Sequence, residues 1–135
     1  MRKMIGWLWI GLLLGPLAGE VAAQVTIRLA RAHQDNQEVA VGLRDVAGLL
    51  RANLPYQGFA LLGATRVGLP AENKPQRLGP LEVRCQGGAE RLSVSVARDG
   101  RTLLNTVVAL RRGQPIILGG FPDGTGRLML ILQTR

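Results

Sequence analysis

Side chains that commonly act as nucleophiles are scarce in this sequence. The only serines are Ser93 and Ser95, both in an alternating apolar segment, and His33 is the only histidine. Serine catalysis needs a base that activates the hydroxyl, and the familiar nucleophile elbow places glycines on both sides of the serine. Neither serine has flanking glycines. The residue inventory argues against a serine hydrolase, and we expect no catalytic residue.

Cys85 is the only cysteine, so the chain cannot form an internal disulfide. It follows Leu81 and Val83 at every second position, on the apolar side of an expected strand over residues 81–86. We expect this thiol to be buried, because free cysteine packs as a small hydrophobic residue. The alternatives are pairing with another chain, or a dyad with His33, which would need an open, electropositive setting.

Metal ligands are equally sparse. One histidine and one cysteine cannot make a structural zinc site. The only close group of oxygen ligands is Asp35, Asn36 and Glu38, which lacks the glycine and terminal glutamate of an EF-hand loop. We interpret this group as a solvated turn and expect neither a metal ion nor a cofactor.

Two glutamates could be considered as a glycosidase pair. Glu82 and Glu90 flank a glycine turn and could approach each other, and such enzymes need two facing carboxylates. Both lie on the polar faces of their expected strands, where nothing nearby would raise the pKa of one carboxyl by burial. Solvent exposure is the simpler interpretation.

Residues 119–126, GGFPDGTG, suggest a phosphate loop. The segment lacks the GK[ST] ending and leads into a strand, whereas a phosphate loop leads into a helix. We expect a wide turn in which Phe121 tucks against the domain.

Arginine dominates the charge of the chain. Removing Arg2, Lys3 and Glu20 with the first 23 residues leaves 15 of 17 basic and 8 of 9 acidic residues, a net charge of +7. All of those basic residues except Lys74 are arginine. Four lie on or beside neighbouring expected strands and could form one basic strip on the surface, with scattered solubilising charge as the alternative. These four are Arg84, Arg91, Arg98 and Arg101.

The arrangement of charge narrows the classes of binding partner that we expect. The arginines are dispersed, and only Tyr56, Phe59 and Phe121 supply aromatic rings after the first 23 residues. Nucleic-acid binding is therefore not expected, because proteins that bind nucleic acid typically carry dense basic segments and aromatic side chains on which bases stack. An envelope protein or an anionic envelope component, such as lipid head groups or acidic polysaccharide, is a better match for a basic exported domain.

The first 23 residues are typical of a secretory signal peptide. Arg2 and Lys3 precede an apolar run over residues 4–17, and small residues at 21–23 precede Gln24. The run is shorter than the roughly 20 residues of a membrane span, although an uncleaved anchor is the alternative. Membrane contact is expected only through residues 4–17, and only if the segment is retained. We expect residues 24–135 to form one exported domain, periplasmic or extracellular.

The clearest secondary structure is a hairpin over residues 90–110. Leu92, Val94 and Val96 alternate with polar or small residues, and Asp99-Gly100 supplies a tight turn. Its second arm, 102–110, is apolar on both faces, as is the last segment, 127–132, so both are expected in the middle of a sheet.

The remaining segments complete the fold prediction. Residues 43–53 carry apolar side chains at helical spacing and end before Pro55, so they predict the one helix. Strands are expected at 25–29, 56–62 and 65–69, with a bulge or a bend at Gly63, and at 81–86 and 115–118, whereas proline-rich residues 70–80 predict an exposed loop.

Together these patterns predict a mainly β domain, a small antiparallel β-sandwich or barrel-like fold with one short helix. For function they favour a non-enzymatic exported module that serves as an interaction or structural part of the cell envelope. The alternative is a carrier for a hydrophobic small molecule, suggested by the apolar residues on both faces of 102–110 and 127–132. Those residues are also needed to build the core of so small a domain.

Overall fold

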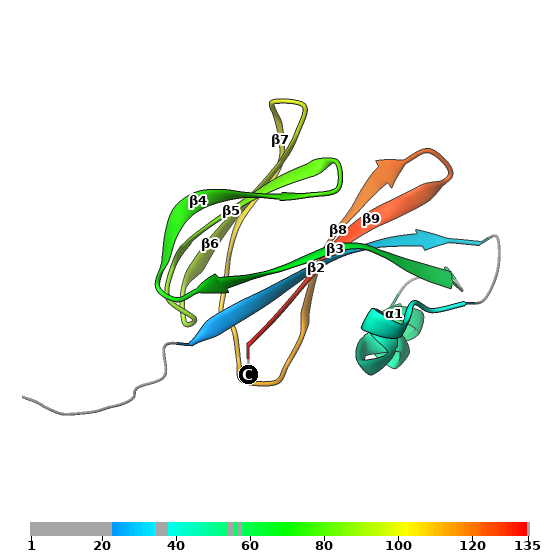
Figure 1. The fold of residues 1–135 in the computed structure, drawn as a ribbon, viewed down its shortest axis with the longest axis horizontal. Coiled ribbons are helices and arrows are strands. Elements are labelled where there is room, and N and C mark those ends of the chain that lie inside the picture. The colour runs from blue at the N-terminus through cyan, green and yellow to red at the C-terminus, as the bar shows by residue number, and fades with distance from the viewer. Residues whose placement is uncertain (1–22, 35–37, 54–55, 57, 135) are drawn as a thin grey trace, which may run out of the picture.

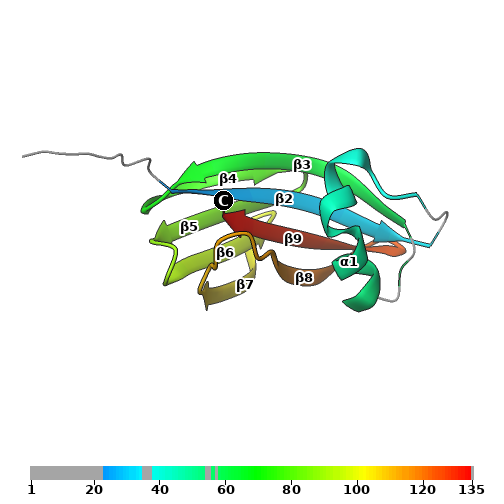
Figure 2. The same ribbon diagram turned by 90° about the horizontal axis from the view of Figure 1, so that it is seen from below.

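The computed structural model describes residues 23–34, 38–53, 56 and 58–134. Two four-stranded antiparallel sheets pack against each other, and one short helical segment covers the outside of the first sheet (Figures 1 and 2). This confirms the predicted mainly β sandwich with one short helix. The predicted signal peptide, apart from Ala23, lies outside the described residues, as do Asp35 and Asn36 of the predicted turn.

The first sheet has the strand order β3-β2-β9-β8. Its strands are β2 (Gln24–His33), β3 (Gly58–Gly68), β8 (Ile116–Asp123) and β9 (Gly126–Thr134). β2 and β9 occupy the centre and pair along their length, from Val25 opposite Thr134 to Ala32 opposite Arg127. A bulge in β3 pairs Gly63 with Leu29 and Leu61 with Ala30, so the break at Gly63 is a bulge in one continuous strand.

The second sheet is a meander with the order β4-β5-β6-β7. Its strands are β4 (Ala71–Leu78), β5 (Leu81–Gly87), β6 (Leu92–Arg98) and β7 (Arg101–Val108). β3 runs almost directly into β4, so the backbone joins the two sheets along this side of the sandwich. On the other side the sheets end at two edge strands, β7 and β8.

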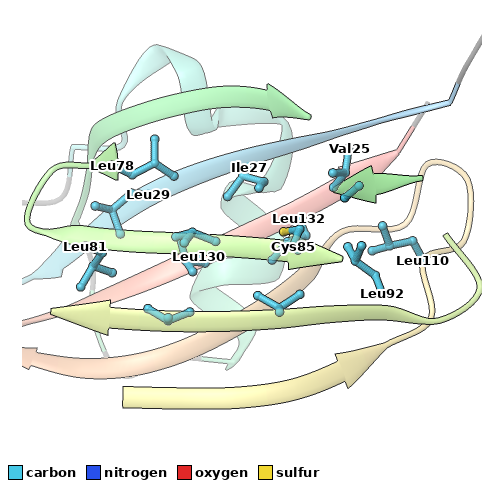
Figure 3. Close-up of a cluster of buried hydrophobic side chains, with 14 of the residues drawn as sticks. Val25, Ile27, Leu29, Leu78, Leu81, Cys85, Leu92, Leu110, Leu130 and Leu132 are labelled. Atoms are coloured by element: carbon cyan, nitrogen blue, oxygen red, sulfur yellow. The ribbon is translucent and has the colours of Figure 1, made fainter. Parts of the chain in front are cut away.

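The main core fills the space between the two sheets. Alternate residues of each inner strand point inward, as period-two strands require. The core joins apolar side chains of the two central strands of the first sheet to those of the two central strands of the second (Figure 3). The first sheet contributes Val25, Ile27 and Leu29 of β2 and Leu128, Leu130 and Leu132 of β9. The second sheet contributes Leu81, Val83 and Cys85 of β5 and Leu92, Val94 and Val96 of β6. Cys85 is buried in this core, as predicted.

A second, smaller core lies on the outer face of the first sheet. The 3-10 helix η2 (Val41–Val46) and the α-helix α1 (Ala47–Asn53) lie across β2 and β9 (Figure 2). They bury Leu43, Val46 and Leu50. Met129 and Ile131 of β9 face them, with Ala30, Ala32 and Phe59. The predicted helix over residues 43–53 therefore exists, although its first part is a 3-10 helix.

This second core explains the sequence of the last strand. Leu128 to Leu132 are all fully buried, with odd and even positions contributing to different cores. The prediction that residues 127–132 lie in the middle of a sheet and are covered on both faces is confirmed.

The hairpin was predicted correctly at its turn but not in its second arm. Asp99 and Gly100 both have positive φ, 52° and 78°, as a two-residue type I′ turn requires. β7, however, is an edge strand, with Val107 52% exposed. The prediction that it lies centrally with a cover on each side was wrong, because the helical segment packs on the other sheet and no strand follows β7 in the order.

Two predicted connections are also strands. Residues 71–78, predicted as a loop, form β4, which tolerates Pro75 because it is an edge strand that pairs only with β5. The predicted turn-rich segment 119–126 mostly continues β8, which extends to Asp123 across a register shift between Gly119 and Phe121. Phe121 packs against the main core, as expected.

Candidate functional site

The four arginines expected to form a basic strip occupy different settings. Arg84, in β5, is an exposed residue on the outer face of the second sheet. Its guanidinium donates to Glu82 at 3.2 Å and to the carbonyl oxygen of Asn73 at 3.4 Å. This arginine is therefore engaged by its own sheet.

Arg98 does not lie on the outer face. It follows Leu92, Val94 and Val96 on the inward side of β6, and its guanidinium reaches across to Asp123 of β8, with both Nη atoms 3.3 Å from Oδ1. Arg31 of β2 contacts the same carboxylate, donating from Nε to Oδ2 at 3.0 Å. One aspartate thus links arginines from both sheets at the end of the sandwich where β6 finishes. We call Arg31, Asp123 and Arg98 the Asp123 cluster.

The electrostatics of the Asp123 cluster favour the charged carboxylate. The hydrogen bond from Arg31, and then the hydrogen bonds and positive charge of Arg98, hold the pKa of the Asp123 carboxyl below its ordinary value of 3.8, although partial burial acts in the opposite direction. Gly126 leaves room for this arrangement, since a Cβ there would lie 2.5 Å from the Ala32 carbonyl oxygen and 3.0 Å from Arg31 Cζ.

Sequence reasoning missed this cluster, although a signal was present. Arg31 continues the apolar alternation of Val25, Ile27 and Leu29, and Arg98 continues that of the β6 core positions. A charged residue at an inward position needs an anionic partner. The partner itself could not be identified, because Asp123 lies 92 and 25 residues away along the chain.

Arg91 and Arg101 are exposed but distant from each other. Arg91 precedes β6, whereas Arg101 begins β7 opposite Arg98, at the other end of the hairpin. Seven residues of β6 separate them, which corresponds to roughly 23 Å of extended chain. The structure brings Arg98 and Arg101 together and leaves Arg84 and Arg91 apart from them.

Arg28 connects the helical segment to the sheet. Its side chain is only 9% exposed and donates to Asp45 Oδ1 at 2.7 Å, to the Gly42 carbonyl oxygen at 3.0 Å and to Gln133 Oε1 at 2.9 Å. Two of these acceptors belong to η2 and the third to β9. The guanidinium therefore fixes η2 on the outer face of the first sheet.

An open groove of about 780 Å³ runs between the helical segment and the ends of β2 and β3. Its polar lining includes His33, Glu38, Arg44 and Arg51, and Phe59 contributes to its apolar lining. Within the described residues, His33 Nδ1 has no hydrogen-bond partner. The groove combines positive and negative side chains with apolar ones, which include Val39, Val41 and Phe59, so its lining alone does not select a class of ligand.

The other candidate groups are held apart. Cys85 is 3% exposed in the main core, and burial raises the pKa of its thiol to about 11, so the thiolate is strongly disfavoured at neutral pH. Glu82 lies near the start of β5 and Glu90 lies beyond its end, so the two do not face each other. Within the described part of the chain, no group of three or more His, Cys, Asp or Glu side chains could hold a metal ion.

No helix in the described ranges is long and apolar enough to span a bilayer. Comparison of the chain with protein-family models, with curated proteins and with solved structures gave no match.

Proposed function

We propose that this protein is an exported, non-enzymatic β-sandwich domain that serves as an interaction module of the cell envelope and binds an anionic component through exposed arginines. The proposal combines the signal-like N-terminal segment with the scarcity of nucleophiles and metal ligands in the sequence.

The observation that carries the proposal is a set of exposed arginines without internal partners. The engaged arginines are Arg28, Arg31, Arg84 and Arg98, each of which pairs with an acidic side chain. Among the described residues, a further set is exposed and makes no ion pair with an acidic side chain. This set is Arg44, Arg66, Arg77, Arg91, Arg101, Arg111 and Arg112. Guanidinium groups not neutralised within the fold remain available to external anions.

The alternative, a carrier for a hydrophobic small molecule, has less support. It was suggested by apolar residues in the last strand, and these residues are packed in the two cores. The exposed Leu103 and Val107 of β7 lie on a sheet edge and not in an enclosed site. Of the two functions, the arginine-mediated interaction uses side chains that the fold leaves exposed.

Copurification from the native host tests the proposal. The full chain, tagged at its C-terminus, would be isolated from envelope extract at low and at high salt. We expect an anionic envelope component to copurify at low salt and to be lost at high salt, because salt screens exposed charge pairs. The double variant R91Q/R111Q should retain less of it, and a control with uncharged replacements in the neighbouring hairpin, S93A/N105A, should match the wild type.

Two outcomes would count against the proposal. Absence of any copurifying component at either salt would contradict it. A native mass that includes a hydrophobic small molecule, unchanged by salt, would favour the carrier alternative.

A further inference from the structure

One end of the sandwich gathers three arginines beside the point where the chain enters the domain. β2 begins at Gln24, and Ala23 just before it accepts a hydrogen bond from the Leu69 N–H at 2.8 Å. The connection from β7 to β8 lies at this same end, because the Gly113 N–H donates to the Thr134 carbonyl oxygen at 2.9 Å and Thr134 pairs with Val25 of β2. The loop before β6 meets this connection, since the Leu110 N–H donates to the Ala89 carbonyl oxygen at 2.7 Å. We call this end of the sandwich the proximal end; Figure 2 shows β2, in blue, beginning there.

The arginines of the proximal end are Arg91, Arg111 and Arg112. All three are exposed, and none forms an ion pair with an acidic residue in the described ranges. Arg111 and Arg112 directly follow Leu110, and Arg91 lies two residues after Ala89. The hydrogen bond between Leu110 and Ala89 therefore brings the two connections that carry these arginines together. The one acidic residue of these two connections is Glu90. The proximal end therefore presents a net positive charge.

The opposite end also contains arginines, and two of them, Arg31 and Arg98, share Asp123. Arg77 and Arg101 make no ion pair in the described ranges, although Asp99 lies two residues before Arg101. Arg127 donates to the Gly120 carbonyl oxygen. Within the described part of the chain, the proximal end thus has three unpaired arginines on two connections that meet, whereas the opposite end has two unpaired arginines, with Asp99 beside one of them.

We propose that the proximal end docks on the head groups of an anionic lipid bilayer. This inference rests on the proposed function and names its partner. Two observations favour a bilayer over an acidic protein. The first is charge complementarity between unpaired guanidinium groups and lipid phosphates, which arginine binds well. The second is the position of the apolar segment over residues 4–17, which precedes this end directly.

The length of the intervening chain limits the distance from the bilayer. Only six residues lead from Leu17 to Ala23, and even fully extended they span no more than about 20 Å. Whenever the apolar segment is in the membrane, during export or as a retained anchor, the proximal end must stay close to the head groups. The surface potential acts within about one Debye length, about 8–10 Å at physiological salt, and this short tether lets the three arginines reach that layer together.

Vesicle binding by the full chain tests the proposal. Cosedimentation would compare vesicles rich in phosphatidylglycerol with vesicles of phosphatidylcholine alone, for the wild type and for R91Q/R111Q/R112Q. Each arginine near an anionic surface contributes on the order of 1 kcal/mol, so the triple variant should bind anionic vesicles about 100-fold more weakly. Binding to phosphatidylcholine, which reports the apolar segment, should not change.

The matched control replaces exposed arginines away from this end, R77Q/R101Q/R127Q, and has the same change in net charge. This control should lose far less of its binding to anionic vesicles than the proximal variant does. Equal losses in both triple variants would overturn the proposal, because net charge alone would then explain binding. Unchanged binding by the proximal variant would also overturn it.

The same measurements separate this inference from the proposed function. If an acidic protein copurifies in a salt-dependent way while the proximal variant binds vesicles like the wild type, the lipid proposal fails and the proposed function stands. If nothing copurifies and anionic vesicles are not preferred, both fail. Circular dichroism and thermal unfolding of each variant would establish that it is folded.

Discussion

Replacing Asp123 by asparagine should weaken the link between the two sheets. The carboxylate accepts hydrogen bonds from Arg31 at 3.0 Å and from both Nη atoms of Arg98 at 3.3 Å. Losing charge-assisted hydrogen bonds typically costs about 1.5–3 kcal/mol. The three side chains are between 25% and 33% exposed, so solvent screening reduces that cost. We expect D123N to lower the free energy of unfolding by about 1–2 kcal/mol near neutral pH.

The stability difference between wild type and D123N should also depend on pH. The pKa of Asp123 in the folded protein lies below its ordinary value of 3.8, so the charged form is favoured by folding. The stabilisation is complete above that ordinary value and is lost as pH falls through the lower, folded-state pKa. The difference between wild type and D123N should therefore be constant from about pH 8 down to about pH 5 and shrink only below about pH 4.

Urea unfolding followed by circular dichroism measures the difference directly. D99N is the matched control, because it also removes one negative charge and asparagine tolerates the positive φ of this turn position. R98Q should cost less than D123N, since removing the shared anion leaves two guanidinium groups facing each other. Equal stabilities of D123N and D99N, or a difference that fades between about pH 7 and pH 5, would refute the assignment.

Two further predictions concern the main core. L130A should lower the free energy of unfolding by about 2–5 kcal/mol, whereas L103A on the exposed edge strand should change it by less than about 1 kcal/mol, and equal effects would contradict the layer assignment. Cys85, whose pKa is raised to about 11, should not react with a thiol reagent near neutral pH unless denaturant is added; rapid labelling of the folded protein would show that this strand opens.

The elements that sequence predicted well are those whose pattern is set by neighbours along the chain. The Asp99-Gly100 turn follows from backbone preferences of two adjacent residues, and the helical spacing of Leu43, Val46 and Leu50 is a local pattern. The burial of Cys85 follows from strand parity. None of these needs knowledge of which strand lies next to which.

The errors arose where strand order decides exposure. Residues 102–110 and 127–132 have the same pattern, apolar on both faces, yet β7 is an edge and β9 is central. Parity shows on which side a residue points but not what covers that side. The helical segment is a single cover, and sequence did not indicate that it packs on β9. The same limit explains β4, where prolines argued against a central strand and were compatible with an edge.

The predicted arginine strip illustrates the limit at the level of a site. Sequence indicated that Arg84, Arg91, Arg98 and Arg101 lie on or beside neighbouring strands, which is correct, with Arg91 just before β6. It did not show that Arg98 points inward to Asp123 or that Arg84 pairs with Glu82. Their role in binding stays a prediction, and only the meeting of two connections places Arg111 and Arg112 at the same end as Arg91.

The pairing of β2 with β9 also governs when the domain can fold. The strand synthesised first in the domain needs, as its central partner, the strand synthesised last. Until Leu128 to Leu132 are available, both cores lack their middle and the helical segment lacks Met129 and Ile131, which it covers. Folding dominated by such distant pairings is slow. A growing chain should therefore remain unfolded until its last strand is available to pair with β2.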